Sequence, residues 1–205
     1  MEQHPSIALE SLASLSVAKC LQRISRVSAG TWQVEGVKVS YGSIKDALSA
    51  HDFKNPASAV YISLEGPATI TSAMIFDPAN IGYVSKCFTG HSFPSGRAIT
   101  PAEEVMLTEL ANIILNALTN TILNALKKSL VPALPRFVEG DIDRLVAEFT
   151  AIPRLKQNFR IVTVLIGMRR NGDAARSEVF ALIPEELAME LENTRPPAGS
   201  HDGIA

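Results

Sequence analysis

The chain has 205 residues, enough for one sizeable domain with its own core. Hydrophobic residues make up 46% and charged residues 20%, and the formal net charge is -2, so the concentrated basic footprint of nucleic-acid-binding proteins is absent. The N-terminus has no basic region followed by an apolar one, which argues against a secretory signal. We therefore expect a cytoplasmic globular protein that binds neither nucleic acid nor membrane.

Cysteines and histidines are too scattered to predict a metal site. Cys20 and Cys87 lie far apart and form no CxxC pair, and the four histidines are equally dispersed. Cys20 falls within a helical apolar pattern, which favours a buried thiol. We expect no metal or cofactor held by this chain itself.

The first half of the chain predicts a helix, a strand and a hairpin. Apolar residues at helical spacing and then at alternating spacing carry this prediction. The expected elements are a helix over 6–28, a strand over 31–41 with a bulge at Glu35-Gly36, a short helical turn over 44–48, a hairpin of strands 59–64 and 68–76, and a short helix over 77–88.

The second half begins with the strongest predicted element. Thr100-Pro101-Ala102-Glu103 is a capping box, and no Gly or Pro follows until Pro132, which predicts a helix of about 29 residues. The remaining expected elements are a strand over 136–139, a short helix over 142–149, strands over 159–168 and 177–183 with Asn171-Gly172 as a hairpin turn, and a helix over 185–192.

The two halves share a layout of long helix, strand and later strand pair, which suggests a pseudo-repeat. The fold class is therefore α+β, with a mixed or antiparallel sheet covered by two long helices. We expect a single domain over residues 1–193 and a disordered tail over 194–205.

The long helix carries an unusual polar stripe. Glu109, Asn112, Asn116 and Thr119 lie along one side, and the rest of the surface is almost entirely aliphatic. Most such stripes are solvated faces of amphipathic helices. However, asparagine is a mediocre helix former, and lysine or glutamate would solvate the face equally well. A partner surface that requires amide groups is the alternative explanation. The same polar residues argue against a membrane span.

The pattern Glu109-x-x-Asn112, followed after 22 intervening residues by Pro135, resembles the signature of the CheC/CheX/FliY family of chemotaxis phosphatases. The segment GPATITSAMIFDPANIGYVSKCFTG, residues 66–90, is also similar to the strand and short helix that precede the family's active helix. The resemblance covers about residues 60–185 and implies a pseudo-two-fold CheC-like fold.

The resemblance also implies a function. Glu109 and Asn112 would be the catalytic pair of a protein-aspartyl-phosphate phosphatase acting on a phosphorylated CheY-like response regulator. The regulator would supply its own Mg²⁺ and a lysine, so the amide of Asn112 would need only to orient the attacking water. Glu109 would pair with that lysine, Asn116 and Thr119 would be peripheral contacts with the partner, and Pro135 would be structural.

Two positions depart from the family pattern. Val105 stands four residues before Glu109, where the family often has Asp or Ser. In the first helix, Glu10 is followed by Ala13 where a second asparagine would be, and Gly36 stands where a proline would follow, so the first helix looks catalytically empty. These departures leave two other functions open: a non-catalytic adaptor that uses the same helix as a docking surface, and a homodimer formed through the aliphatic long helix.

Overall fold

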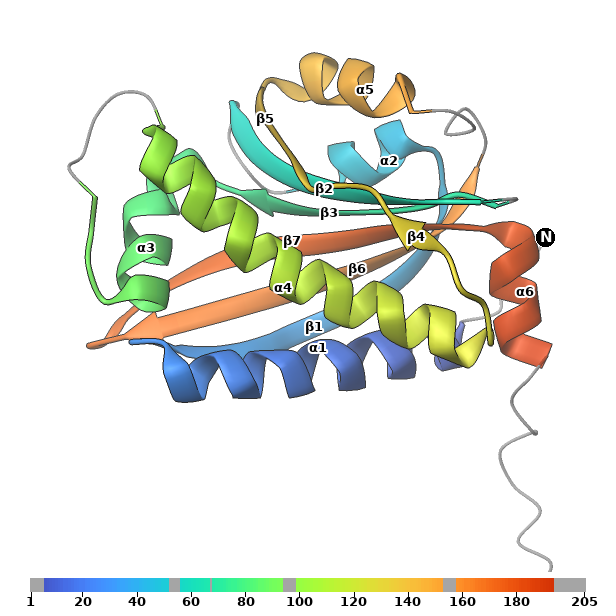
Figure 1. Cartoon of the computed structure of the whole chain (residues 1–205), viewed down its shortest axis with the longest axis horizontal. Helices are drawn as coiled ribbons and strands as arrows, with labels where there is room; N and C mark the ends of the chain where they lie inside the picture. The colour runs from blue at the N-terminus through green and yellow to red at the C-terminus, as the bar shows by residue number, and fades with distance from the viewer. Residues whose placement is uncertain (1–5, 52–55, 67, 94–98, 153–157, 194–205) are drawn as a thin grey trace, which may run out of the picture.

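The computed structural model describes residues 6–51, 56–66, 68–93, 99–152 and 158–193 (Figure 1). The first half of the chain forms α1 (Ile7–Val27), β1 (Thr31–Gly42), α2 (Ile44–Ser49), β2 (Ala57–Glu65), β3 (Ile70–Phe76), η1 (Pro78–Asn80) and α3 (Ile81–Thr89). The second half forms α4 (Pro101–Ala125), β4 (Val131–Pro132), β5 (Arg136–Gly140), α5 (Ile142–Thr150), β6 (Phe159–Arg170), β7 (Asp173–Pro184) and α6 (Glu185–Asn193). The predicted tail over 194–205 lies outside the described residues.

All helices and strands predicted from the sequence are present, and the predicted α+β class is confirmed. The seven described strands form one sheet in the order β1-β6-β7-β3-β2-β4, with β5 also pairing with β2. Every pair is antiparallel, which decides between the mixed and antiparallel alternatives. The two-residue strand β4 was not predicted.

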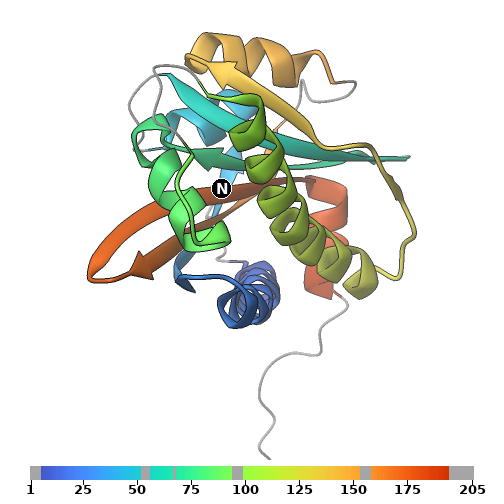
Figure 2. The ribbon, with the colours of Figure 1, turned by 60° about the vertical axis from the view of Figure 1, so that its left-hand side comes forward.

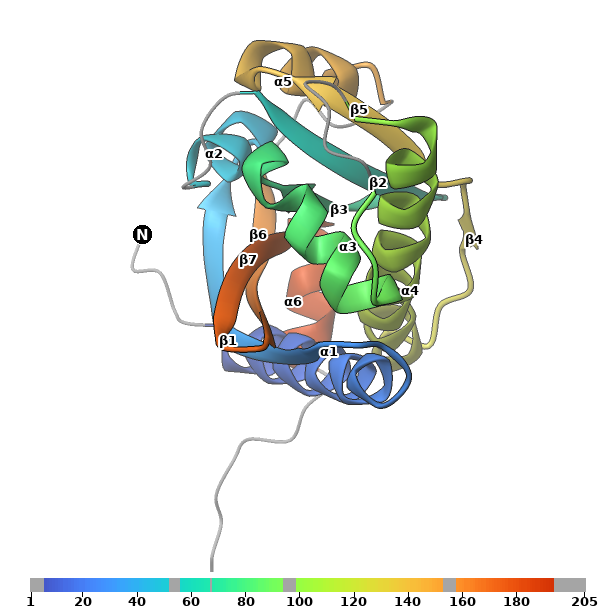
Figure 3. The ribbon, with the colours of Figure 1, turned by 90° about the vertical axis from the view of Figure 1, so that its left-hand side faces the viewer.

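Helices cover both faces of this sheet. Figure 1 shows α2 and α5 on one face, while Figure 3 shows α1 and α4 on the other. The side chains of β2 alternate accordingly: Val60 and Ile62 point into the larger core beneath α1 and α4, whereas Ala59 and Tyr61 point into the smaller core beneath α2 and α5. Two hydrophobic cores therefore lie on opposite sides of a sheet that is buried between them.

The predicted pseudo-repeat is present as an approximate two-fold relation. The order α1-β1-α2-β2-β3-α3 in the first half matches α4-β5-α5-β6-β7-α6 in the second. Exchanging the halves maps the β1–β6 pair onto the β5–β2 pair and the central β3–β7 pair onto itself. The two long helices are thus equivalent elements, and Figure 2 shows α4 inclined across the molecule with α1 viewed nearly along its axis.

Local sequence signals explain two further details. The register of β1 against β6 shifts between Val34 and Gly36, which is the predicted bulge. The turn between β6 and β7 has positive φ at both Asn171 and Gly172, 54° and 91°, as the Asn-Gly pair predicts for this kind of hairpin.

The long helix is shorter than predicted. It has 25 residues and ends at Ala125 rather than about four residues later. Lys127 has a φ of 52°, its N–H donates to the carbonyl of Asn124 at 3.1 Å, and the N–H of Lys128 donates to the carbonyl of Leu123 at 3.0 Å. These are the hydrogen bonds of a Schellman motif. The C-terminus of α4 could not be predicted from the sequence because lysine occupies the left-handed position that glycine usually takes.

Candidate functional site

The helix α4 is held firmly at its N-terminus and along one side. The Thr100 hydroxyl accepts from the backbone N–H of Glu103, and the Glu103 carboxylate accepts from the Thr100 backbone N–H and hydroxyl, both at 2.8 Å, so the predicted capping box forms. Apolar side chains at helical spacing then fill the larger core: Met106, Leu107, Leu110, Ala111, Ile114, Leu115, Leu118, Ile122 and Leu123. This packing fixes which side of α4 faces outward.

The outward side has one row that combines apolar residues with a carboxylate. Val105, Glu109 and Ile113 follow one another at four-residue steps, and all three are exposed. Val105 is 63% exposed and Ile113 is 43% exposed, which is unusual for aliphatic residues on a helix whose other side is a complete core. We call these three residues the acid row.

Beside the acid row lies a row of amides: Asn112, Asn116, Asn120 and Asn124. Asn112 and Asn116 are half-buried, whereas Asn120 and Asn124 are exposed. The Nδ2 of Asn116 donates to the Oδ1 of Asn112 at 2.7 Å. We call these four residues the amide row.

The two predicted catalytic residues are accessible on this surface. Glu109 and Asn112 are three residues apart, one in each row, so their side chains share a face. Glu109 makes no hydrogen bond or ion pair with any other residue in the described part of the chain. A partner could therefore engage both groups without first breaking a contact of the carboxylate.

Thr119, predicted as a peripheral partner contact, is in fact buried. Its side chain is fully covered, and its hydroxyl donates to the carbonyl of Leu115 at 2.8 Å. At about 100° per residue, Thr119 is rotated roughly 80° away from Glu109, which takes it past the edge of the exposed sector. That prediction is corrected: Thr119 is buried, and the next polar residue along the helix, Asn120, is exposed.

The exposed aliphatic residues of the acid row and the Asn116–Asn112 hydrogen bond were not predicted as parts of the site. Val105 and Ile113 lie four residues before and after Glu109, so the sequence places them on the same side of the helix. The sequence does not show which side of the helix is covered, and their exposure could therefore not be predicted. The hydrogen bond between the amides had a weaker signal, since a four-residue spacing permits contact without requiring it.

The equivalent helix α1 presents no comparable pair. Ala13, at the position where an asparagine would be expected, is buried at 1% exposure. α1 instead packs alongside α4, and the Cys20 thiol lies 3.8 Å from the carbonyl oxygen of Ile113. Burial raises the pKa of this thiol. The first helix therefore supports α4 within the fold.

The aliphatic side of α4 is covered by the chain's own sheet and helices. The homodimer alternative requires an aliphatic face of the long helix that is free to pack against a second copy. That side of α4 is not free. By length and composition α4 is apolar enough to span a membrane, and half of the relevant window is buried inside the fold.

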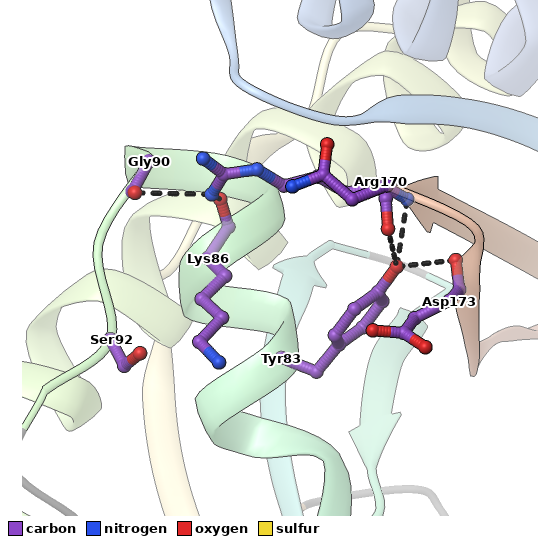
Figure 4. A pocket seen from close by; sticks show the side chains of 7 residues that line it. Tyr83, Lys86, Gly90, Ser92, Arg170 and Asp173 are labelled. Atoms are coloured by element: carbon purple, nitrogen blue, oxygen red, sulfur yellow. Dashed lines mark hydrogen bonds between the residues drawn. The ribbon is translucent and has the colours of Figure 1, made fainter.

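A pocket also lies between α3 and the β6–β7 turn (Figure 4). It has a volume of about 260 Å³. The Arg170 guanidinium donates to the backbone carbonyls of Lys86 and Gly90, and the Tyr83 hydroxyl accepts from the Arg170 N–H at 2.7 Å and lies 2.5 Å from the Asp173 carbonyl. Because these groups satisfy one another, they hold the end of α3 against the turn.

No group of three or more His, Cys, Asp or Glu side chains in the described ranges is arranged to hold a metal ion. No protein-family model and no curated protein matches the sequence.

Solved structures are similar to this chain in fold. Thermotoga maritima FliY superposes with a TM-score of 0.67 at 12% identity, covering 95% of this chain and 96% of that one. The FliM middle domain from H. pylori has a TM-score of 0.64 at 11% identity, covering 95% and 100%. A chain of the CheX-CheY-BeF3-Mg²⁺ complex from Borrelia burgdorferi has a TM-score of 0.51 at 16% identity, covering 85% and 97%. This chain therefore has the α+β CheC-like fold that FliY, the FliM middle domain and CheX share.

Proposed function

We propose that this protein accelerates hydrolysis of the aspartyl phosphate on a CheY-type response regulator, with Glu109 and Asn112 as its catalytic pair. The observation that carries the proposal is an exposed carboxylate, without a partner among the described residues, and a half-buried carboxamide one helical turn away, on a helix whose other side packs into the core. The fold similarity to CheX, one structure of which is a complex with CheY, supports the choice of partner. Such a protein acts in the cytoplasm, where response regulators are found.

Hydrolysis of the aspartyl phosphate requires few groups from the phosphatase itself. A water oxygen forms a bond to phosphorus, the bond from phosphorus to the aspartyl oxygen breaks with its electron pair staying on the regulator's carboxylate, and the water protons end on inorganic phosphate and solvent. The regulator's own Mg²⁺ and lysine neutralise the phosphoryl oxygens, so positioning of the water is the main contribution left. The oxygen of Asn112 can accept from this water while its NH₂ group donates to a phosphoryl oxygen.

Glu109 is suited to fix the docking register. An exposed carboxylate without a partner in the described part of the chain can pair with the regulator's lysine when the two surfaces meet. Val105 and Ile113 stand one turn on either side of Glu109 and would exclude water from that pair. In this arrangement, the valine that replaces the family's Asp or Ser belongs to the docking surface rather than to the catalytic group.

The test is the rate of phosphate release from a CheY-type regulator charged with acetyl phosphate. We expect wild-type protein to accelerate release, Asn112→Ala to abolish the acceleration, and Glu109→Ala to weaken both binding and rate. Asn120→Ala, which removes an exposed amide two turns further along the same row, is the matched control and should retain the wild-type rate. Equal release by wild type and Asn112→Ala would refute the catalytic assignment.

A non-catalytic adaptor is the second candidate. The fold matches to FliY and the FliM middle domain have higher TM-scores than the match to CheX, and the exposed acid row is suited to docking whether or not catalysis follows. An adaptor would bind the regulator loaded with BeF3⁻ and Mg²⁺ and leave its phosphate release unchanged. Binding with acceleration supports the phosphatase, and binding without acceleration supports the adaptor.

A further inference from the structure

The amide row contains one internal hydrogen bond, and it involves the proposed catalytic amide. Asn116 Nδ2 donates to Asn112 Oδ1 at 2.7 Å across one turn of α4. In the described part of the chain, Asn120 and Asn124 make no side-chain hydrogen bond, although they continue the same row. The coupling therefore belongs to the one pair that includes Asn112, and it is not a general property of the row.

This bond is the main restraint on the Asn112 carboxamide. No atom of the described residues accepts a hydrogen bond from Asn112 Nδ2, so the NH₂ group of the amide is unpaired within the described part of the chain. Rotation of an asparagine carboxamide about its last torsion angle is broad and roughly two-fold, so an unrestrained side chain samples both orientations. The hydrogen bond from Asn116 Nδ2 to Oδ1 favours one of these two orientations of the Asn112 carboxamide.

We propose that Asn116 is the positioning residue for Asn112, and this inference rests on the proposed phosphatase function. By donating to Oδ1, Asn116 holds that oxygen toward residue 116 and leaves Nδ2 on the opposite side of the carboxamide. Oδ1 keeps a second lone pair for the attacking water, and Nδ2 is free to donate to a phosphoryl oxygen. Asn116 touches neither the water nor the phosphate.

The expected effect of this restraint is on rate rather than on binding. An amide that is already oriented does not lose rotational freedom when the transition state forms, and catalytic groups need orientation within narrow limits. Glu109 and the aliphatic residues beside it would still dock the regulator. We therefore expect loss of Asn116 to lower kcat by about tenfold and to leave KM within about twofold.

The experiment compares three substitutions of Asn116 in the phosphate-release assay. Asn116→Ala removes the donor and should give the tenfold loss in kcat. Asn116→Gln retains an amide donor at a four-residue spacing and should recover most of the rate. Asn116→Asp presents only an acceptor at neutral pH, so it requires Asn112 to turn its NH₂ group toward the helix and should lower kcat further than Asn116→Ala.

Matched controls come from the next amide along the row. Asn120→Ala and Asn120→Asp make the same chemical changes on the exposed face and should leave kcat within about twofold of wild type. Thermal melting of each variant excludes loss of folding as the cause. If Asn116→Ala and Asn120→Ala release phosphate at the same rate as an active wild type, the inference is overturned and the proposed function stands.

A measurement on the protein alone separates the two claims. The side-chain amide resonances of Asn112 in a ¹⁵N–¹H spectrum should shift in Asn116→Asp and stay in place in Asn120→Asp. Unchanged Asn112 resonances in Asn116→Asp would overturn the positioning role. A wild type that binds the regulator without accelerating release would overturn the proposed function, and the spectrum would still decide whether Asn116 orients Asn112.

Discussion

Thr119 and Asn120 are neighbours in the chain, but α4 places them in opposite environments. Thr119 is fully buried and returns its hydroxyl to the helix backbone, whereas Asn120 faces outward. Asn112 and Asn116 lie between these extremes, half-buried and bonded to each other. At the scale of single residues, chemical type alone therefore does not determine which polar groups a partner can reach.

Ile113 offers a direct test of the docking surface. Replacing this exposed isoleucine with aspartate places a second negative charge one turn from Glu109, where a regulator's lysine and apolar surface are expected to meet. We expect Ile113→Asp to raise KM for the charged regulator about tenfold or more. Val131→Asp, which changes an aliphatic residue of β4 that is 78% exposed, is the matched control and should leave KM unchanged. Equal effects of the two substitutions would place the docking surface elsewhere.

The stability of the folded protein should depend on pH through Tyr61. It is 3% exposed, and its hydroxyl donates to the Glu148 carboxylate at 2.8 Å. Burial and then this carboxylate raise the pKa of Tyr61 to about 12, whereas the unfolded chain has an ordinary value of 10.0. The neutral phenol is thus favoured in the folded state, and its contribution to stability is complete below pH 10 and is lost as the pH rises toward 12.

We therefore predict that the free energy of unfolding falls more steeply between pH 10 and pH 12 in wild type than in Tyr61→Phe, by up to about 1.4 kcal/mol per pH unit. At pH 7, Tyr61→Phe should lose about 1 kcal/mol because Glu148 loses one donor. Urea denaturation at a series of pH values measures both effects. Parallel alkaline slopes for the two proteins would contradict the prediction.

Among the secondary-structure elements, α4 has an N-terminus that the sequence predicts and a C-terminus that it does not. The capping box at Thr100 is legible in the sequence, and the structure forms it. The end depends on Lys127, a residue that adopts left-handed backbone without the freedom of glycine. This end allows the chain to leave α4 toward β4 at the sheet edge, where β4 pairs with β2.

Replacing Lys127 with glycine should therefore stabilise the protein. Glycine adopts a φ of 52° without the steric penalty of a Cβ atom, and the gain should be about 1 kcal/mol, partly offset by the added freedom of the unfolded chain. Lys128→Gly is the matched control, since Lys128 has no positive φ and forms an exposed ion pair with Glu190 at 2.9 Å. It should lose stability. Urea denaturation distinguishes the outcomes, and equal losses for the two lysines would contradict the prediction.

At the scale of the whole molecule, the two halves unite in one sheet whose centre is the β3–β7 pair. The approximate two-fold relation makes α1 and α4 equivalent in position, yet only α4 carries a glutamate followed three residues later by an asparagine. α1 and α3 instead contribute the two buried thiols, Cys20 toward α4 and Cys87 beside Gly30. The larger core thus depends on contacts that cross from one half to the other.

Both thiols should report the opening of this core. Burial raises the pKa of Cys20 and of Cys87, so little reactive thiolate is present at pH 8, and both residues are buried. We predict that a disulfide reagent labels the native protein at least about tenfold more slowly than the unfolded protein, and that both thiols react once guanidinium unfolds the chain. Rapid labelling of either thiol in the native state would show that its side of the core opens without unfolding.

The amino-acid sequence alone suffices to predict the local elements and the chemistry available to the site. Apolar spacing located the helices and strands, the capping box marked the start of α4, and Asn171-Gly172 specified a hairpin turn. The spacing of Glu109 and Asn112 placed both on one face of one helix. These features depend on residues close together in the chain, so they are legible without the rest of the molecule.

The sector of α4 that remains uncovered depends on tertiary packing and could not be predicted from the sequence. Helical periodicity gives the angles between residues, but the boundary of the covered sector is set by α1 and by strands distant in sequence. That boundary buries Thr119, exposes Val105 and Ile113, and leaves Asn112 half-covered beside Asn116. The polar stripe on the long helix became a specific surface through packing, because burial is a property of the whole fold.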